Sequence, residues 1–144
     1  MCIRDRFKRP RLTPNPVFVF KDNRFYMSLG TPGGDVQPQA MAQVLLNHVL
    51  FGMDLQMSVE VPRVASFNFP NSFWPHAYIP GSVKIEQSIF KESGVLLEEF
   101  GYKVLKWRCL DRAAGSVCCV MKDDNTGFLL SAADPRRESY SVGW

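Results

Sequence analysis

A glycine-rich loop between a predicted strand and a predicted helix is the feature that most constrains how this chain can fold. The run Phe25–Leu29 is rich in aromatic and apolar residues and predicts a strand, and the loop Gly30–Asp35, GTPGGD, follows it directly. From Pro38 to Phe51 apolar residues recur at helical spacing on more than one face, which predicts a well-buried helix. Gly52 suits the position just after its last turn. The chain must therefore pass from a strand into a helix through one short loop.

The remaining predicted elements are short strands and helices. Val17–Lys21 is rich in β-branched and aromatic residues, and a tight turn at Asp22-Asn23 pairs it with the strand before the loop. Helices are predicted at Asp54–Glu60, with Asp54 as N-cap, and at Phe90–Phe100, with Val95, Leu96, Leu97 and Phe100 facing inward. Further strands are predicted at Val64–Phe69, Val83–Gln87, Lys103–Trp107, Gly115–Met121 and Phe128–Ala132.

The order of these elements predicts the fold class. It indicates an α+β fold, in which helices cover antiparallel hairpins, and not a βαβ repeat. The aromatic stretch Val64–Gly81 extends well beyond its strand. Loops of that length inside a compact domain tend to be functional or to cover something.

Composition excludes several classes of protein. The chain has 144 residues, 46% hydrophobic and 22% charged, which indicates one globular domain. The net charge of +3 is small and spread out, so we expect no nucleic-acid partner, and no apolar run approaches the roughly 20 residues that span a bilayer. The four cysteines form no metal-ligand spacing with His48 or His76. We therefore expect no metal site, and we expect the cysteines to be small buried residues.

Three roles are open to the Gly30–Asp35 loop. A phosphate cradle needs GxxxxGK[ST] or GxGxxG, and neither spacing occurs here, while Asp35 would repel a phosphate. An oxyanion hole would use Gly33 and Gly34, whose adjacent N–H groups can point to one spot without a Cβ to block the substrate. A turn without chemistry would use the same glycines. The last two roles stay open, because no complete set of nucleophile and base is evident.

Five motifs occur in a fixed order along the chain: KRP (8–10), GTPGGDVQPQAMAQVLLNHVLFGMD (30–54), VPR (61–63), AADPRR (132–137) and VGW (142–144). Together they resemble the C-terminal part of the small subunit of the gamma-glutamyltransferase family. The resemblance implies an N-terminal-nucleophile hydrolase with a four-layer αββα sandwich, of which this chain would be a part. It also implies that Gly33 and Gly34 form the oxyanion hole, and that no cofactor is used.

The resemblance further implies the chemistry and the partners. In that family a precursor cleaves itself, and the new N-terminal threonine is the nucleophile, with its own amino group as base. A gamma-glutamyl or related acyl or amide group is then hydrolysed or transferred. The implied partners are a small-molecule amide substrate, the large subunit and the N-terminal part of the small subunit.

Four more residues take expectations from the resemblance. Many family members carry a Ser-Ser pair shortly after KRP that holds the substrate carboxylate, and Leu12 and Thr13 stand at those positions here. Thr13 and Asp35 are expected on the substrate side, with recognition that differs from the glutathione type. Arg63 and Arg136 match family motifs, and we expect each to form a structural ion pair or to bind backbone carbonyls.

The chain is expected to be a fragment. The nucleophilic threonine is not among its residues, and MCIRDR at its start matches the translation of a transposon adaptor used for sequencing libraries. Residues 1–6 are therefore expected to be an artefact, and 7–144 to be the C-terminal portion of a gamma-glutamyltransferase-like small subunit. The alternatives are a non-catalytic module that binds small anions and an interaction domain that presents a bare sheet face.

Overall fold

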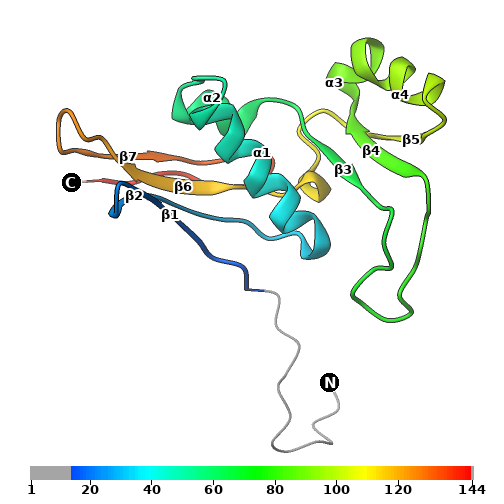
Figure 1. Cartoon of the computed structure of the whole chain (residues 1–144), viewed down its shortest axis with the longest axis horizontal. Coiled ribbons are helices and arrows are strands. Elements are labelled where there is room, and N and C mark those ends of the chain that lie inside the picture. Colours follow the sequence, from blue (N-terminus) through cyan, green and yellow to red (C-terminus); the bar gives the residue numbers. More distant parts are fainter. Residues whose placement is uncertain (1–13, 144) are drawn as a thin grey trace, which may run out of the picture.

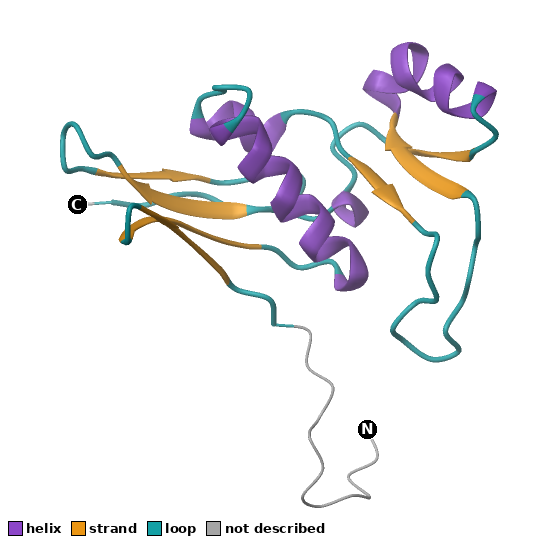
Figure 2. Ribbon diagram, in the orientation of Figure 1, coloured by secondary structure: helices purple, strands orange, loops and turns teal. Residues whose placement is uncertain are grey.

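The computed structural model describes residues 14–143 and consists of two small sheets with helices against them (Figure 1, Figure 2). The larger sheet has the strand order β1-β2-β6-β7, and all of its neighbouring strands are antiparallel. Its strands are β1 (Val17–Lys21), β2 (Arg24–Gly30), β6 (Cys118–Lys122) and β7 (Leu129–Ala132). The predicted hairpin is confirmed, because Asp22 and Asn23 take the left-handed backbone conformation (φ 50° and 60°) that a tight hairpin turn requires.

Two helices cover one face of the larger sheet (Figure 1). These are α1 (Gln37–Val49) and α2 (Leu55–Glu60), and the side chain of Asp54 caps α2 by accepting a hydrogen bond from Met57 N–H, as predicted. The core lies between them and the sheet and is built mainly from Met27, Leu29, Ala40, Met41, Val44, Leu55, Val59, Val117, Cys119 and Ala132.

The prediction that α1 is buried on more than one face is wrong for this chain. Ala40, Met41 and Val44 are buried, but Leu46 and Val49 on the other side are 49% and 58% exposed. The helix therefore packs one stripe against the sheet and presents a second apolar stripe outward.

The face of the larger sheet away from the helices is also apolar. The strand register places Phe18 opposite Ser28 and Ser28 opposite Val120, so these residues form one row across the sheet. Phe18 is 64% exposed and Val120 is 37% exposed. One helix layer and one sheet are thus in contact here, and the second face of the sheet has room for a further layer.

The smaller sheet contains β3 (Val64–Ser66), β4 (Ser82–Glu86) and β5 (Lys103–Trp107). Strands β4 and β5 are parallel, and α3 (Gln87–Ile89), a π-helical turn η2 (Phe90–Gly94) and α4 (Val95–Glu99) connect them. This single βαβ unit, which is not a repeat, was not foreseen in the sequence. The sequence predicts only that the helical run between these strands covers a sheet. In the structure the same run also forms the crossover connection that parallel strands require.

The crossover differs from the sequence prediction in its burial as well. Val95, Leu96 and Phe100 were predicted to face inward, yet they are 45%, 53% and 79% exposed. The π-helical turn shifts the register of the apolar positions, because it inserts a wider turn at Phe90–Gly94. A Cβ at Gly94 would lie 2.5 Å from the Phe90 ring, so this turn depends on a glycine there.

Candidate active site

The glycine loop at the end of β2 has the backbone geometry of a donor site. Gly33 has φ 140° and ψ 12°, and Gly34 has φ 57°, so both residues occupy conformations that side chains disfavour. A short 3-10 helix, η1 (Gly34–Val36), leads from them directly into α1. Within residues 14–143, neither the Gly33 N–H nor the Gly34 N–H donates a hydrogen bond. Two adjacent donors at a helix start are therefore available to an anion or an oxyanion.

A threonine fixes this loop to the segment before β6. The Ser116 N–H donates a hydrogen bond to Thr31 Oγ1 (2.7 Å), and the Thr31 hydroxyl donates to the Pro32 carbonyl (2.8 Å). The segments also approach closely at Gly115 (φ 86°), where an added Cβ would lie 3.1 Å from Thr31 Oγ1 and 3.1 Å from Ala40 Cβ. The glycine pair is thus held by tertiary contacts and does not rely on its own turn alone.

The long aromatic loop between β3 and β4 lies against the other side of the glycine pair. The Ser72 N–H donates to Asp35 Oδ2 (2.7 Å), and the Ser72 hydroxyl donates to Asp35 Oδ1. A Cβ at Gly34 would lie 3.0 Å from the Phe73 ring. This confirms that the long loop covers something, namely the residues that follow β2. Asp35 was predicted on the substrate side, and here its carboxylate positions the aromatic loop; its contact with a substrate stays a prediction.

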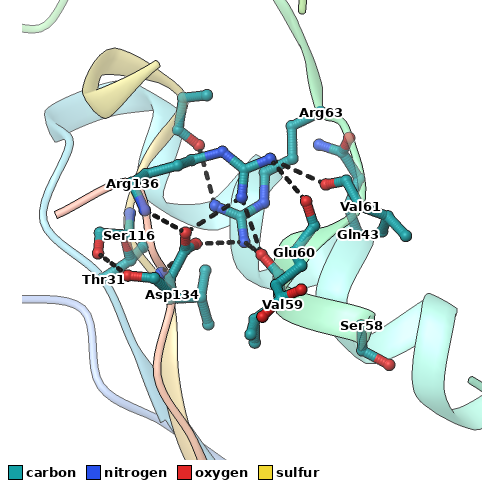
Figure 3. A network of polar contacts seen from close by, with 12 residues as sticks. Thr31, Gln43, Ser58, Val59, Glu60, Val61, Arg63, Ser116, Asp134 and Arg136 are labelled. Carbon is teal, nitrogen blue, oxygen red and sulfur yellow. Dashed lines mark hydrogen bonds and ion pairs between the residues drawn. The ribbon is translucent and has the colours of Figure 1, made fainter. Parts of the chain in front are cut away.

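Behind the glycine loop lies a buried network of charged side chains (Figure 3). Arg63 Nη2 is 2.6 Å from Asp134 Oδ2, Arg136 Nη1 is 3.1 Å from Asp134 Oδ1, and Arg136 Nη2 is 2.5 Å from Glu86 Oε2. All four side chains are buried. The prediction of structural ion pairs for Arg63 and Arg136 is therefore confirmed.

The network also binds the backbone of several elements. Arg136 donates to the carbonyls of Val59 and Val61, at the end of α2, and Arg63 donates to the carbonyl of Val59. Asp134 accepts from the Val117 N–H (3.0 Å), one residue after the Ser116 that holds Thr31. The network therefore connects α2, β4 and the start of β6 to the anchor of the glycine loop.

Burial and pairing act differently on the two arginines. Burial lowers the pKa of Arg63 and outweighs the neighbouring Asp134, and the Arg63 Nε has no hydrogen-bond partner in the described part of the chain. Burial also acts to lower the pKa of Arg136, but its hydrogen bonds and charge pairing with Glu86 and Asp134 together raise it. Arg136 is thus the better-satisfied cation of the pair.

The histidines form no catalytic pair with each other in this structure. His48 Nδ1 lies 2.8 Å from the Met53 carbonyl, and since a carbonyl only accepts, this nitrogen donates and His48 Nε2 (2.9 Å from Tyr26 Oη) accepts from the phenol. His76 lies in the aromatic loop and bonds the Asn71 carbonyl. Thr13 lies outside the described residues.

The cysteine prediction is correct in part. Cys119 is buried on β6, and burial raises its pKa to about 11. Cys109 and Cys118 are exposed, so the expectation that they are buried is wrong. Among the described residues no cluster of three or more His, Cys, Asp or Glu side chains is placed to hold a metal ion. No helix in residues 14–143 has the length and apolarity needed to cross a bilayer.

Two members of the network were missed at the sequence level. Asp134 stands inside the AADPRR motif, whose arginine Arg136 carries the family resemblance. Glu86 stands at the end of an alternating strand, where a charge is usually solvated. A buried arginine needs an acid near it, so the prediction of ion pairs for Arg63 and Arg136 could have prompted a search for these two carboxylates.

Comparison with solved structures places the fold in a known class. The chain matches the structure of a gamma-glutamyltranspeptidase from Pseudomonas nitroreducens with a TM-score of 0.75 and 22% identity, over 97% of this chain and 66% of that one. This is the fold of the N-terminal-nucleophile hydrolases, and the predicted α+β class is confirmed. A family model described as gamma-glutamyltranspeptidase matches residues 5–144. The chain belongs to the gamma-glutamyltranspeptidase family.

Curated relatives agree with this assignment. The chain is 26% identical over 136 residues to the glutathione hydrolase proenzyme of Bacillus subtilis strain 168, covering 94% of this chain and 21% of the relative. It is 28% identical over 137 residues to the oxamate amidohydrolase proenzyme of Klebsiella pneumoniae, covering 95% of this chain and 25% of the relative. The chain thus spans about a fifth to a quarter of the length of these relatives.

Proposed function

We propose that this chain supplies the oxyanion hole of an enzyme that hydrolyses or transfers a gamma-glutamyl or related acyl group. Gly33 N–H and Gly34 N–H are the two donors. The observation that carries the proposal is the geometry of this glycine pair, namely two adjacent N–H groups at a helix start, unpaired within residues 14–143 and in backbone conformations that favour glycine. Family membership adds the reaction class, because the named relatives are a glutathione hydrolase and an oxamate amidohydrolase.

In the proposed mechanism an N-terminal threonine from a preceding part of the small subunit attacks the amide carbonyl carbon. The threonine hydroxyl proton passes to its own α-amino group and then to the leaving amine, whose bond to carbon breaks. Negative charge develops on the carbonyl oxygen during each attack, and the Gly33 and Gly34 N–H groups bind it. Water or an amine then takes the acyl group from the threonine ester and restores the hydroxyl.

The described side chains support this role by holding the donors in place. Thr31 fixes the loop to Ser116, and Asp35 ties its other side to the aromatic loop through Ser72. A preorganised donor pair needs no rearrangement as charge develops, which is the source of its catalytic effect. We also propose that the large subunit and a second sheet pack on the exposed apolar face at Phe18 and Val120. Thr13 and Asp35 stay proposed on the substrate side.

The test is made in the complete enzyme that contains this chain, with gamma-glutamyl-p-nitroanilide and oxamate as substrates. Gly33→Ala cannot keep φ 140° and ψ 12°, so the Gly33 and Gly34 N–H groups must rotate. We expect kcat on the better substrate to fall about 10²–10³-fold, the usual effect of losing one oxyanion donor.

The matched control is Gly52→Ala. Gly52 also has a positive φ (67°), but an added Cβ there meets open space and lies away from the loop. We expect Gly52→Ala to lose a modest amount of stability, as Gly33→Ala should, and to keep the kcat of the parent enzyme. A Gly33→Ala enzyme with kcat within about threefold of the parent would contradict the proposal. A complete enzyme that stays uncleaved on a denaturing gel and is still active would contradict the threonine mechanism.

A further inference from the structure

A small cavity has Asp35, the residue that follows the glycine pair, in its wall. Its volume is about 200 Å³, and it lies between the aromatic loop, β4 and the residue that follows Gly34. Its described lining consists of Asp35, Phe67, Phe69, Asn71, Ala77, Ile79 and Lys84. Most of this wall is apolar or aromatic, and Lys84 contributes a positive charge.

The Lys84 ammonium group rests on two aromatic rings. Its Nζ is 5.0 Å from the centre of the Phe67 ring and 5.9 Å from the centre of the Trp107 ring. The two rings meet edge to face, with centres 6.3 Å apart. Cation–π contacts of this kind hold the ammonium group in place on the cavity wall.

Lys84 makes no ion pair with any carboxylate in the described part of the chain. Glu86 lies on the same side of β4, two residues on, but its oxygens are taken by Arg136, the Arg63 N–H and the Asp111 N–H. Aromatic rings attract a cation but do not satisfy its hydrogen-bond donors. The ammonium group is therefore held in place, with hydrogen-bond donors left to bind an anion at the cavity.

The size of the cavity limits what can enter it. An apolar cavity of about 150 Å³ is enough to bind benzene, so about 200 Å³ holds one ring with a short polar arm. The aromatic and aliphatic wall suits the ring, and Lys84 suits a carboxylate on the arm. The opposite arrangement is unfavourable, since a carboxylate beside Asp35 would meet a like charge.

We propose that this cavity is a substrate subsite for a ring that carries a carboxylate, the carboxylate pairing with Lys84. The subsite adjoins the proposed oxyanion donors because Asp35, in its wall, directly follows Gly34, and because Phe73 of the same aromatic loop packs on Gly34. The amide substrate then has an aromatic carboxylate group close to the bond that is cleaved. This assignment rests on the proposed function. Lys84 then binds a substrate carboxylate in a chain that has Leu12 and Thr13 where many family members have the Ser-Ser pair.

The test measures binding and does not need catalysis. The complete enzyme that contains this chain is titrated with phenylacetate, phenylacetamide and acetate, and binding is followed by calorimetry and by tryptophan fluorescence, to which Trp107 contributes. We expect saturable binding in the order phenylacetate, phenylacetamide, acetate. Lys84→Met should weaken phenylacetate binding at least about tenfold, as loss of a charged hydrogen bond does, and leave phenylacetamide binding unchanged.

The control is Lys103→Met, which removes an exposed lysine of β5 in the same sheet and should leave the affinity for phenylacetate unchanged. Ala77→Trp fills the cavity and should abolish binding of both aromatic ligands, so the proposal can be tested even if Lys84→Met does not fold. Equal phenylacetate affinity in Lys84→Met and the parent, or unchanged binding in Ala77→Trp, overturns the subsite. That result would leave the oxyanion assignment intact, because kcat of Gly33→Ala decides it separately.

Discussion

Replacing Asp134 by asparagine tests how far the buried network holds this part of the molecule together. Asp134 is fully buried and pairs with Arg63 at 2.6 Å and with Arg136 at 3.1 Å. It also accepts hydrogen bonds from the Val117 and Arg136 N–H groups, at 3.0 Å each. Asparagine keeps the shape and one acceptor oxygen, but it removes the negative charge between two buried guanidinium groups.

The expected loss follows from that uncompensated charge. Breaking a buried ion pair by removing one partner costs about 3–5 kcal/mol, and the asparagine side chain can keep the bond to Val117, so we expect a loss of about 3 kcal/mol. Domains of this size unfold with about 5–15 kcal/mol, so the loss is a large share of the total. It corresponds to a decrease in Tm of roughly 10 °C.

The assay is equilibrium unfolding in urea, followed by circular dichroism at neutral pH. The control is Glu92→Gln, which removes an exposed carboxylate from the crossover and should leave the midpoint unchanged. A double variant, Asp134→Asn with Arg63→Met, removes one buried cation as well and should lose less than the sum of the two single losses. A loss below about 1 kcal/mol for Asp134→Asn, or strict additivity in the double variant, would refute the reasoning.

Three further changes have defined outcomes. Burial raises the pKa of Cys119 from 9.0 to about 11, so the folded state keeps the thiol proton to higher pH than the unfolded state does. The free energy of unfolding should therefore fall as pH rises from about 9 toward 11. Between about pH 8 and about pH 10.5, the urea midpoint of Cys119→Ala should fall less than that of the parent. Asp54→Ala removes the cap of α2 and should lower the free energy of unfolding by about 1 kcal/mol, measured in urea, whereas no change would argue against the cap. Thr31→Val leaves the Ser116 N–H without its acceptor and should lower that free energy by about 1–3 kcal/mol; unaltered hydrogen exchange at Ser116 would contradict this.

Sequence-based prediction succeeded for features that depend only on neighbouring residues. The Asp22-Asn23 turn, the Asp54 cap and the strand before the glycine loop are all present, because each depends on neighbouring residues. The parallel pairing of β4 with β5 was missed, because it depends on where the chain returns after a helix. Burial of Val95, Leu96 and Phe100 was also predicted wrongly, because helical spacing shows that a face is apolar but not what covers it.

The candidate site likewise has features that depend on neighbouring residues and features that depend on residues far apart in the sequence. The glycine pair was singled out from the sequence, because adjacent glycines leave two N–H groups open to a substrate and because the motifs resemble the family, and its oxyanion role stays a proposal. The contacts that hold the pair could not be found, because Ser116 is 85 positions away from Thr31 and Ser72 is 37 away from Asp35. Lys84 carries no motif at all, and its place at a cavity follows only from the packing of Phe67 and Trp107 beside it.

Strand β4 joins the two parts of the proposed site. Side chains alternate along a strand, so Lys84 and Glu86 lie on one side of it, with Lys84 at the cavity and Glu86 in the charged network. Glu86 pairs with Arg136, Arg136 pairs with Asp134, and Asp134 holds the backbone next to the Ser116 anchor of the glycine loop. The proposed anion-binding group and the proposed oxyanion donors are therefore held at a fixed spacing by buried ion pairs. An intact buried ion pair need not add net stability compared with apolar residues, although breaking it is costly, so we infer that this network serves to hold the subsite in position relative to the donors.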